Sequence, residues 1–232
     1  MSTSVAPQVG AGSTSRIEAF SDAVFAISAT LLVVSLEVPR DFAGLMKSVE
    51  GSVAFALSFA IFIQIWLSHH RYFRDFPLAD GWNIAINSVL LFLVLFFVYP
   101  LKFLMLGFVR WIFGIGDVGR VTLRELDLVF AIYGAGWLAV FLCFAALYWR
   151  AARNHALLGL GPERRADASL EAQLALTFGL VGALSALLAL AGLTRYYGLP
   201  GFLYALMGPI GYWSGSTWER RRAALAARYA AG

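Results

Sequence analysis

The chain is poor in cysteine and in charged residues, and each shortage excludes a class of protein. It has one cysteine, Cys143, among 232 residues, which excludes an intramolecular disulfide framework and a zinc or iron–sulfur site built from several cysteines. Charged residues make up 14% of the chain, against about 25% in an ordinary soluble domain, and 60% of the residues are hydrophobic. This composition excludes an intrinsically disordered chain and argues strongly against a water-soluble globule.

Long runs without Asp, Glu, Lys or Arg are the main feature of the sequence. Five of them hold 20 to 23 residues each: 51–70, 81–101, 128–149, 172–194 and 196–218. About 20 apolar residues suffice for a helix to cross the hydrocarbon core of a bilayer. The hydrophobicity of these runs is continuous and does not alternate, so each run is predicted to be a transmembrane helix and not a barrel strand.

A sixth run, 23–36, is shorter, with 14 uncharged residues between Asp22 and Glu37. We predict a helix over 16–37, whose first turns carry Arg16, Glu18 and Asp22 into the interfacial zone or the protein interior. An ionisable residue at membrane depth is a functional-site hypothesis by default. The first helix is therefore the one to inspect for function.

The prediction is an all-α integral membrane protein with six transmembrane helices, and both termini therefore lie on one side. That side holds eleven of the 18 Lys and Arg residues and the other holds seven, which favours cytoplasmic termini. Residues 1–15 are expected to form a flexible tail, since they lack the basic region of a signal peptide. Residues 219–232 are expected to form a basic cytoplasmic segment after the transmembrane domain, 16–218. The six helices are expected at about 16–37, 48–70, 82–106, 126–150, 171–194 and 197–217.

Asp22 needs a polar partner if it lies inside the membrane. The candidates on the same side are His69 and His70, at the end of the second helix, and Asn83 and Asn87, at the start of the third. Such a cluster either fixes helix packing or binds a proton and takes part in gating, and the sequence leaves both open. Gly179 and Gly182 are expected to be helix-contact sites.

The first three helices resemble those of the transmembrane protein 175 family, which are potassium channels of lysosomes and of many prokaryotes. Similar residues are found over 16–100, and beyond residue 100 only the hydropathy profile agrees. The resemblance is carried by Arg16, Phe20, Ser21 and Asp22, followed by AVFAI and TLLV; by WLSHHRYF at 66–73; and by Asn87 and the Tyr99-Pro100 step.

The resemblance implies a homotetramer in which four copies of the first helix line a central pore. By position after the motif, the narrowest ring is Ile27, with Leu31 and Val34 deeper and the Thr30 hydroxyl beside this line. The resemblance implies that the permeant ion is potassium and that it passes transiently near Ile27 and Leu31. No cofactor and no tightly bound metal are implied.

The resemblance also implies a role for the polar motif. Arg16, Ser21 and Asp22 would hold the helices together through His70 and Asn87 near the cytoplasmic mouth, with His69 beside them.

An apolar stripe on the first helix agrees with the implied pore. Phe20, Ile27, Leu31 and Val34 form a continuous apolar line, and apolar constrictions gate by dewetting. Ordinary packing is the other interpretation of this stripe. The sequence lacks a Thr-Val-Gly-Tyr-Gly filter and a helix with Arg at every third position, so neither a carbonyl filter nor a voltage sensor is expected.

The leading hypothesis is a passive potassium-permeable channel in the plasma membrane of a prokaryote, with the bilayer and further copies of the chain as its partners. The alternative is a proton-coupled secondary transporter that uses Asp22 and His70. A structural membrane subunit is a further possibility. An enzyme is not expected, because no nucleophile and base can be paired from the sequence, and no nucleic-acid partner is expected.

Overall fold

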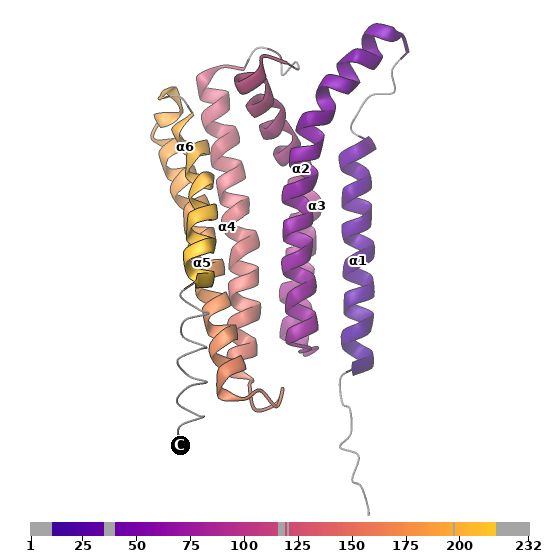
Figure 1. The fold of residues 1–232 in the computed structure, drawn as a ribbon, viewed down its shortest axis with the longest axis vertical. Helices are drawn as coiled ribbons and strands as arrows, with labels where there is room; N and C mark the ends of the chain where they lie inside the picture. The colour runs from indigo at the N-terminus through magenta and orange to yellow at the C-terminus, as the bar shows by residue number, and fades with distance from the viewer. Residues whose placement is uncertain (1–10, 35–39, 116–118, 120, 197, 217–232) are drawn as a thin grey trace, which may run out of the picture.

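The computed structural model describes residues 11–34, 40–115, 119, 121–196 and 198–216, and these fold into a bundle of helices (Figure 1). Short 3-10 and helical turns follow the fifth long helix, and residues 207–216 are again helical. The elements are α1 (Ala11–Val34), α2 (Phe42–Asp75), α3 (Gly81–Phe113), α4 (Leu123–Arg153), α5 (Pro162–Leu190), η1 (Leu193–Arg195), α6 (Leu199–Phe202) and η2 (Leu203–Leu206).

The helix ends are set by local capping and not by the limits of the charge-free runs. The side chains of Asp41 and Asp80 accept hydrogen bonds from the first turns of α2 and α3. Thr122 and Glu125 form a reciprocal capping box at the start of α4. Gly114, with a φ of 68°, ends α3 in the left-handed region that glycine adopts without strain.

The helices therefore begin and end at other residues than the sequence predicts. α1 begins at Ala11, within the expected tail, and α5 begins at Pro162, well before the predicted 171. The predicted helix over 197–217 is divided among α6, η2 and the helical residues 207–216. The rest of the expected tail and the basic segment 219–232 lie outside the described residues.

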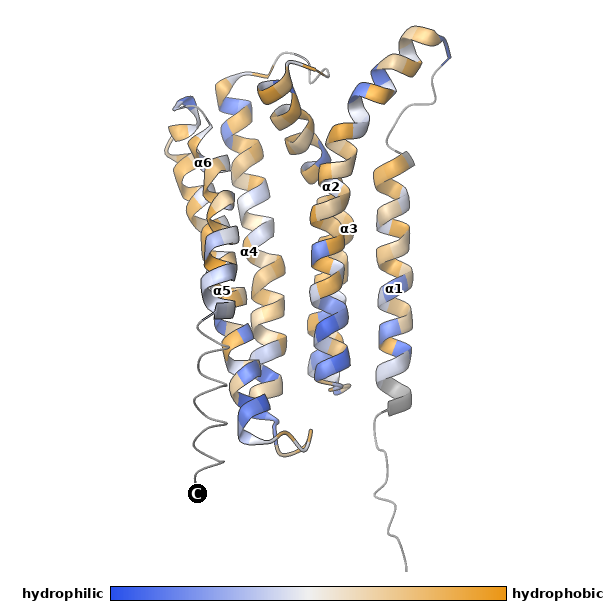
Figure 2. Ribbon diagram, in the orientation of Figure 1, coloured by the Kyte–Doolittle hydropathy of each residue, from blue (hydrophilic) through white to orange (hydrophobic). Residues whose placement is uncertain are grey.

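Four of the described helices, α2 to α5, are long and apolar enough to cross a bilayer. Figure 2 shows apolar residues along most of their length and hydrophilic residues at the ends where α2 finishes and α5 begins. The predicted all-α membrane fold is confirmed at this level. A count of six spans stays a prediction.

The helices form two groups that meet along α3 and α4. Figure 1 shows α1 beside α2 and α3, while α5 and the segment after it lie against α4. One apolar core joins the groups, with Phe25 from α1, Phe73 from α2, Leu90 from α3 and Phe144 from α4.

The contact between α4 and α5 depends on glycine. A Cβ on Gly182 would lie 2.8 Å from the carbonyl oxygen of Gly134, and one on Gly179 would lie 3.3 Å from Cδ1 of Leu138. The predicted role of Gly179 and Gly182 as helix-contact sites is thus confirmed.

Candidate functional site

Helix α1 has two distinct faces. Ser21, Phe25, Ser28 and Leu32 are buried and recur every three or four residues, so they share the face that packs on α2 and α3. The Ser21 and Ser28 hydroxyls donate to backbone carbonyls of the preceding turn, at 2.8 and 2.9 Å. These four residues form the buried face of α1, on which both serine hydroxyl protons are hydrogen-bonded.

The opposite face of α1 is exposed in the single chain. Phe20 is 62% exposed and Ile27 is 56% exposed, whereas Leu31 is half-buried at the edge of this face. Val34 is the last residue of α1, and its side chain lies outside the described residues. An apolar surface of this kind on a membrane protein faces lipid or another protein chain.

Thr30 lies on the exposed face and offers an oxygen there. Its hydroxyl donates to the Ala26 carbonyl at 2.9 Å, which uses the proton and leaves the oxygen its acceptor lone pairs. An oxygen with lone pairs on an otherwise apolar face can interact with a passing cation.

A buried chain of hydrogen bonds connects the buried face of α1 to α3 and α2. The Asn87 amide donates to the Ser21 hydroxyl oxygen at 3.0 Å, and the His69 Nε2 lies 2.8 Å from the Asn87 Oδ1. Because the Ser21 proton is used on the Ile17 carbonyl and Oδ1 only accepts, His69 must carry its proton on Nε2. The hydrogen bonds are therefore donated in one direction, from His69 on α2 to Asn87 on α3 and from Asn87 to Ser21 on α1.

Asp22 has a partner that the sequence did not single out. The Trp66 indole N–H donates to the Asp22 carboxylate at 2.9 Å, and the His70 ring stacks on Trp66 with a centroid distance of 5.7 Å. Trp66 lies one turn before His69 and His70 on α2, so helical spacing gives a signal for it. Of the two histidines, it is His69 that meets Asn87.

Two other predicted residues lie apart from the Ser21–Asn87–His69 hydrogen-bond chain. Arg16 is exposed near the start of α1. Asn83 is buried in a second cluster, where its amide donates to the Tyr72 hydroxyl at 2.7 Å and its oxygen accepts from Arg150 at 2.8 Å. Arg150 also pairs with Asp80, so this cluster ties α4 to α2 and α3.

Sequence reasoning did not find Arg150, although its place directly after the charge-free run 128–149 puts it on the same side as the start of the third helix. As for metal sites, the described residues contain no group of three or more His, Cys, Asp or Glu side chains that could hold an ion.

The comparisons with known proteins agree with this arrangement. The family model described as "Endosomal/lysosomal potassium channel TMEM175" matches residues 16–100, which include most of α1, all of α2 and most of α3. A protein of Marivirga tractuosa named "Potassium channel" is 38% identical over 206 residues, covering 84% of this chain and 83% of the relative. The chain belongs to the TMEM175 family.

Two solved structures of the TMEM175 family have the same fold. A crystal structure of the potassium channel MtTMEM175, as a single-residue variant bound to a nanobody fusion, matches with a TM-score of 0.73 and 36% identity. It covers 88% of this chain and 93% of the other. The crystal structure of a TMEM175 homolog from Chamaesiphon minutus, titled a homolog of a lysosomal potassium-selective channel, matches with a TM-score of 0.53 and 26% identity. The match covers 87% of this chain and 97% of the other.

The TMEM175 match covers the part of the chain that holds the Ser21–Asn87–His69 chain of hydrogen bonds. All of these relatives are named or titled as potassium channels, which are not enzymes. Their names favour a channel over the proton-coupled transporter that uses Asp22 and His70.

Proposed function

We propose that the chain forms a potassium-permeable channel in the plasma membrane of a prokaryote, with α1 of each of four copies around a central pore. Membership of the TMEM175 family supports potassium as the permeant ion and a location in the membrane. The observation that carries the pore assignment is the apolar face of α1, on which Ile27 is 56% exposed although the opposite face is buried. A central axis shared by further copies gives this face a partner.

Ile27 forms the constriction in this proposal, and Leu31 and Val34 continue the apolar line away from it. An apolar ring excludes water when it is narrow and admits a hydrated ion when it widens. Thr30 places its hydroxyl oxygen beside the ring, where it compensates part of the cation's lost hydration. Conduction is passive, and no cofactor or resident metal takes part.

The hydrogen-bond chain to Asn87 acts as an anchor for the pore helix. It holds α1 by the buried Ser21, which lies on the face opposite to the exposed apolar side chains. The Trp66 contact to Asp22 adds a second attachment one residue further along. The position of each Ile27 relative to the axis then depends on α2 and α3.

The proposed topology has six spans, counting α1, α2 to α5, and the segment that begins with α6. Arg74 in the last turn of α2 and Arg150 and Arg153 in the last turn of α4 lie at the end of the molecule where α1 begins (Figure 1). Basic residues concentrate on the cytoplasmic side of membrane proteins, so this end faces the cytoplasm in the proposed topology, in line with the predicted cytoplasmic termini.

The Ile27→Asn variant tests the constriction. A polar ring stays wetted, so single-channel potassium conductance should rise several-fold and the preference for potassium over sodium should weaken. Planar bilayer recordings of the purified channel in symmetric and bi-ionic salt measure both quantities.

Leu180→Asn is the matched control, because Leu180 is also 56% exposed but lies on α5, away from α1. It should leave conductance and selectivity unchanged. Unaltered conductance and selectivity in Ile27→Asn would remove Ile27 from the pore.

A further inference from the structure

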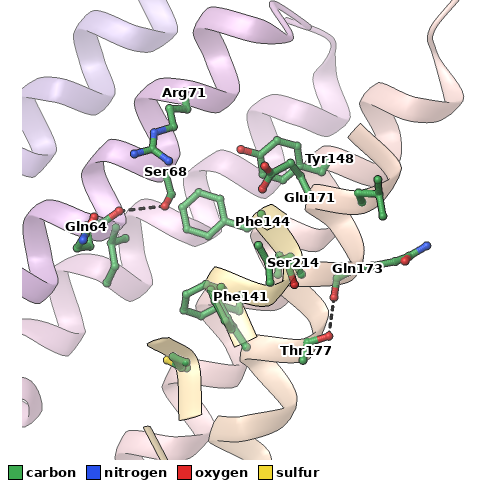
Figure 3. Close-up of a pocket in the computed structure, with 18 of the residues that line it drawn as sticks. Gln64, Ser68, Arg71, Phe141, Phe144, Tyr148, Glu171, Gln173, Thr177 and Ser214 are labelled. Carbon is green, nitrogen blue, oxygen red and sulfur yellow. Dashed lines mark hydrogen bonds between the residues drawn. The ribbon is translucent and has the colours of Figure 1, made fainter. Parts of the chain in front are cut away.

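A large cavity separates α2 from α5 on the side away from α1. Its volume is about 940 Å³, and it lies between α2, α4, α5 and the helical residues 207–216 (Figure 3). This is within the range of sites that hold small organic ligands. The pore proposal does not use this cavity.

One part of the cavity is apolar and open. Phe141 and Phe144 from α4 and Phe178 from α5 present rings to it, and Figure 3 shows the first two pointing into the space between the helices. The facing segment contributes Gly211, whose missing Cβ would lie 3.7 Å from the Phe178 ring, in ordinary van der Waals contact. The wall is thus shaped for hydrocarbon, and an apolar wall of this kind holds water poorly.

The other part carries charges of both signs. Arg71 comes from the last turns of α2, and Arg164, Asp167 and Glu171 come from the first turns of α5. Glu171 is within electrostatic reach of Arg71, Asp167 and Asp75. Asp75 also lines the cavity, but its carboxylate pairs with the adjacent Arg74 at 3.0 Å. Two cationic and three anionic side chains line this end of the cavity.

We propose that this cavity binds a membrane phospholipid with a zwitterionic, primary-amine headgroup, of the phosphatidylethanolamine type. The phosphate would face Arg71 and Arg164, and the ammonium would donate hydrogen bonds to Asp167 and Glu171. An acyl chain would lie along the phenylalanine rings. The presence of both arginines and carboxylates fits a headgroup that carries charges of both signs, and the three carboxylates make a purely anionic headgroup fit less well.

The position of the charges agrees with this orientation of the lipid. They belong to the last turns of α2 and the first turns of α5, where Figure 2 shows hydrophilic residues. Phe178 comes further along α5, toward the middle of that helix. A lipid in the cavity would fill the space between the α1–α3 group and the α5 group. The proposal concerns a membrane-embedded chain and does not depend on what the pore conducts.

Native mass spectrometry of the detergent-purified oligomer tests the proposal by titration with three lipids of equal chain length. Phosphatidylethanolamine should bind most tightly. Phosphatidylcholine, whose methylated ammonium has no N–H donor, and phosphatidylglycerol, which has no ammonium, should each bind about fivefold or more weakly.

Two variants test the two parts of the cavity. Glu171→Gln removes the acceptor charge and should reduce the preference for phosphatidylethanolamine over phosphatidylcholine, whereas the matched change Glu163→Gln, outside the cavity, should preserve it. Gly211→Leu fills the apolar wall and should weaken binding of all three lipids about tenfold. Gly107→Leu, at a position with no atom within 4 Å of the new Cβ, is its control.

Equal affinity for the three lipids in the unmodified protein would overturn headgroup recognition. Unchanged lipid binding in Gly211→Leu would overturn the cavity as the site. A loss of oligomer mass in Gly211→Leu, with no change in lipid binding per chain, would assign the cavity to a neighbouring copy and overturn the proposal. Because lipid binding is measured without ion flux, none of these results depends on the pore assignment, which the Ile27→Asn recordings test separately.

Discussion

Asn87 is the residue that links the three helices matched by the family model. Its side-chain nitrogen donates a hydrogen bond to Ser21 on α1, and its side-chain oxygen accepts one from His69 on α2. All three side chains are buried, so removal of the amide leaves His69 without this partner in a place that water does not reach easily. An unpaired buried polar group typically costs about 1–3 kcal/mol.

The Asn87→Ala variant should therefore lower the free energy of unfolding by about 1–3 kcal/mol. Thermal unfolding of the purified protein in detergent measures the loss. Ser88→Ala is the control, since Ser88 is exposed and its hydroxyl donates to the Ile84 carbonyl of its own helix. Equal melting temperatures for the two variants would show that the Asn87 contacts contribute nothing to stability.

The residue types of this cluster were predictable, but their pairing was not. The sequence placed Asp22, the two histidines and Asn87 at one end of the bundle. Neighbouring residues on a helix point about 100° apart, so the choice between His69 and His70 depends on the rotation of α2, which sequence spacing does not supply. The Trp66 contact to Asp22 depends on the same rotation.

At the scale of elements, the contact between α4 and α5 is a close backbone approach of two helices. Gly134 and Gly182 face one another, and a Cβ on Gly182 would also lie 3.0 Å from the Trp137 side chain. Without a hydrophobic driving force inside the bilayer, helices gain stability from this kind of close backbone packing.

The Gly182→Leu variant should separate α4 from α5, because backbone atoms cannot move aside as a side-chain end can. We expect destabilisation of more than about 2 kcal/mol, in the range of core overpacking, and reduced yield of folded protein. Thermal unfolding and gel-filtration profiles report both. Gly107→Leu meets open space and should be tolerated. Wild-type stability in Gly182→Leu would contradict the close contact.

The sequence predicted which segments are helical better than where they end. Charge-free runs found the apolar centres of α2 to α5, because burial in lipid excludes charge along those turns. Helices continue past the apolar zone until a cap stops them, as at Gly114 after α3, so the observed elements are longer than the runs. The predicted last helix carries Pro200 and Pro209, and it is divided into shorter segments.

At the scale of the molecule, the described residues of the single chain leave Phe20 and Ile27 on α1 exposed. In the proposed tetramer, the face of each α1 that carries these residues points toward the central axis and the same face of the other copies. Native mass spectrometry in detergent should give a protein mass of four times 25.3 kDa, and chemical cross-linking should stop at four chains. A monomer or dimer at concentrations that support channel activity would contradict a four-helix pore.

The assembly could be inferred from the sequence only through the family resemblance. Composition and charge identify a membrane protein, but the number of copies depends on how the exposed faces fit together. The cavity between α2 and α5 also could not be predicted, since it arises from the spacing of two helix groups that are distant in the chain.

The claim that α1 lines the pore is tested most directly by cadmium block of a cysteine at position 27. In a Cys143→Ala background, which removes the only native thiol, Ile27→Cys would place a ring of thiols at the constriction. Thiols bind soft divalent metals, so micromolar Cd²⁺ should abolish potassium current through Ile27→Cys and spare Leu180→Cys. Potassium current through Ile27→Cys that persists unchanged in Cd²⁺ would contradict the account.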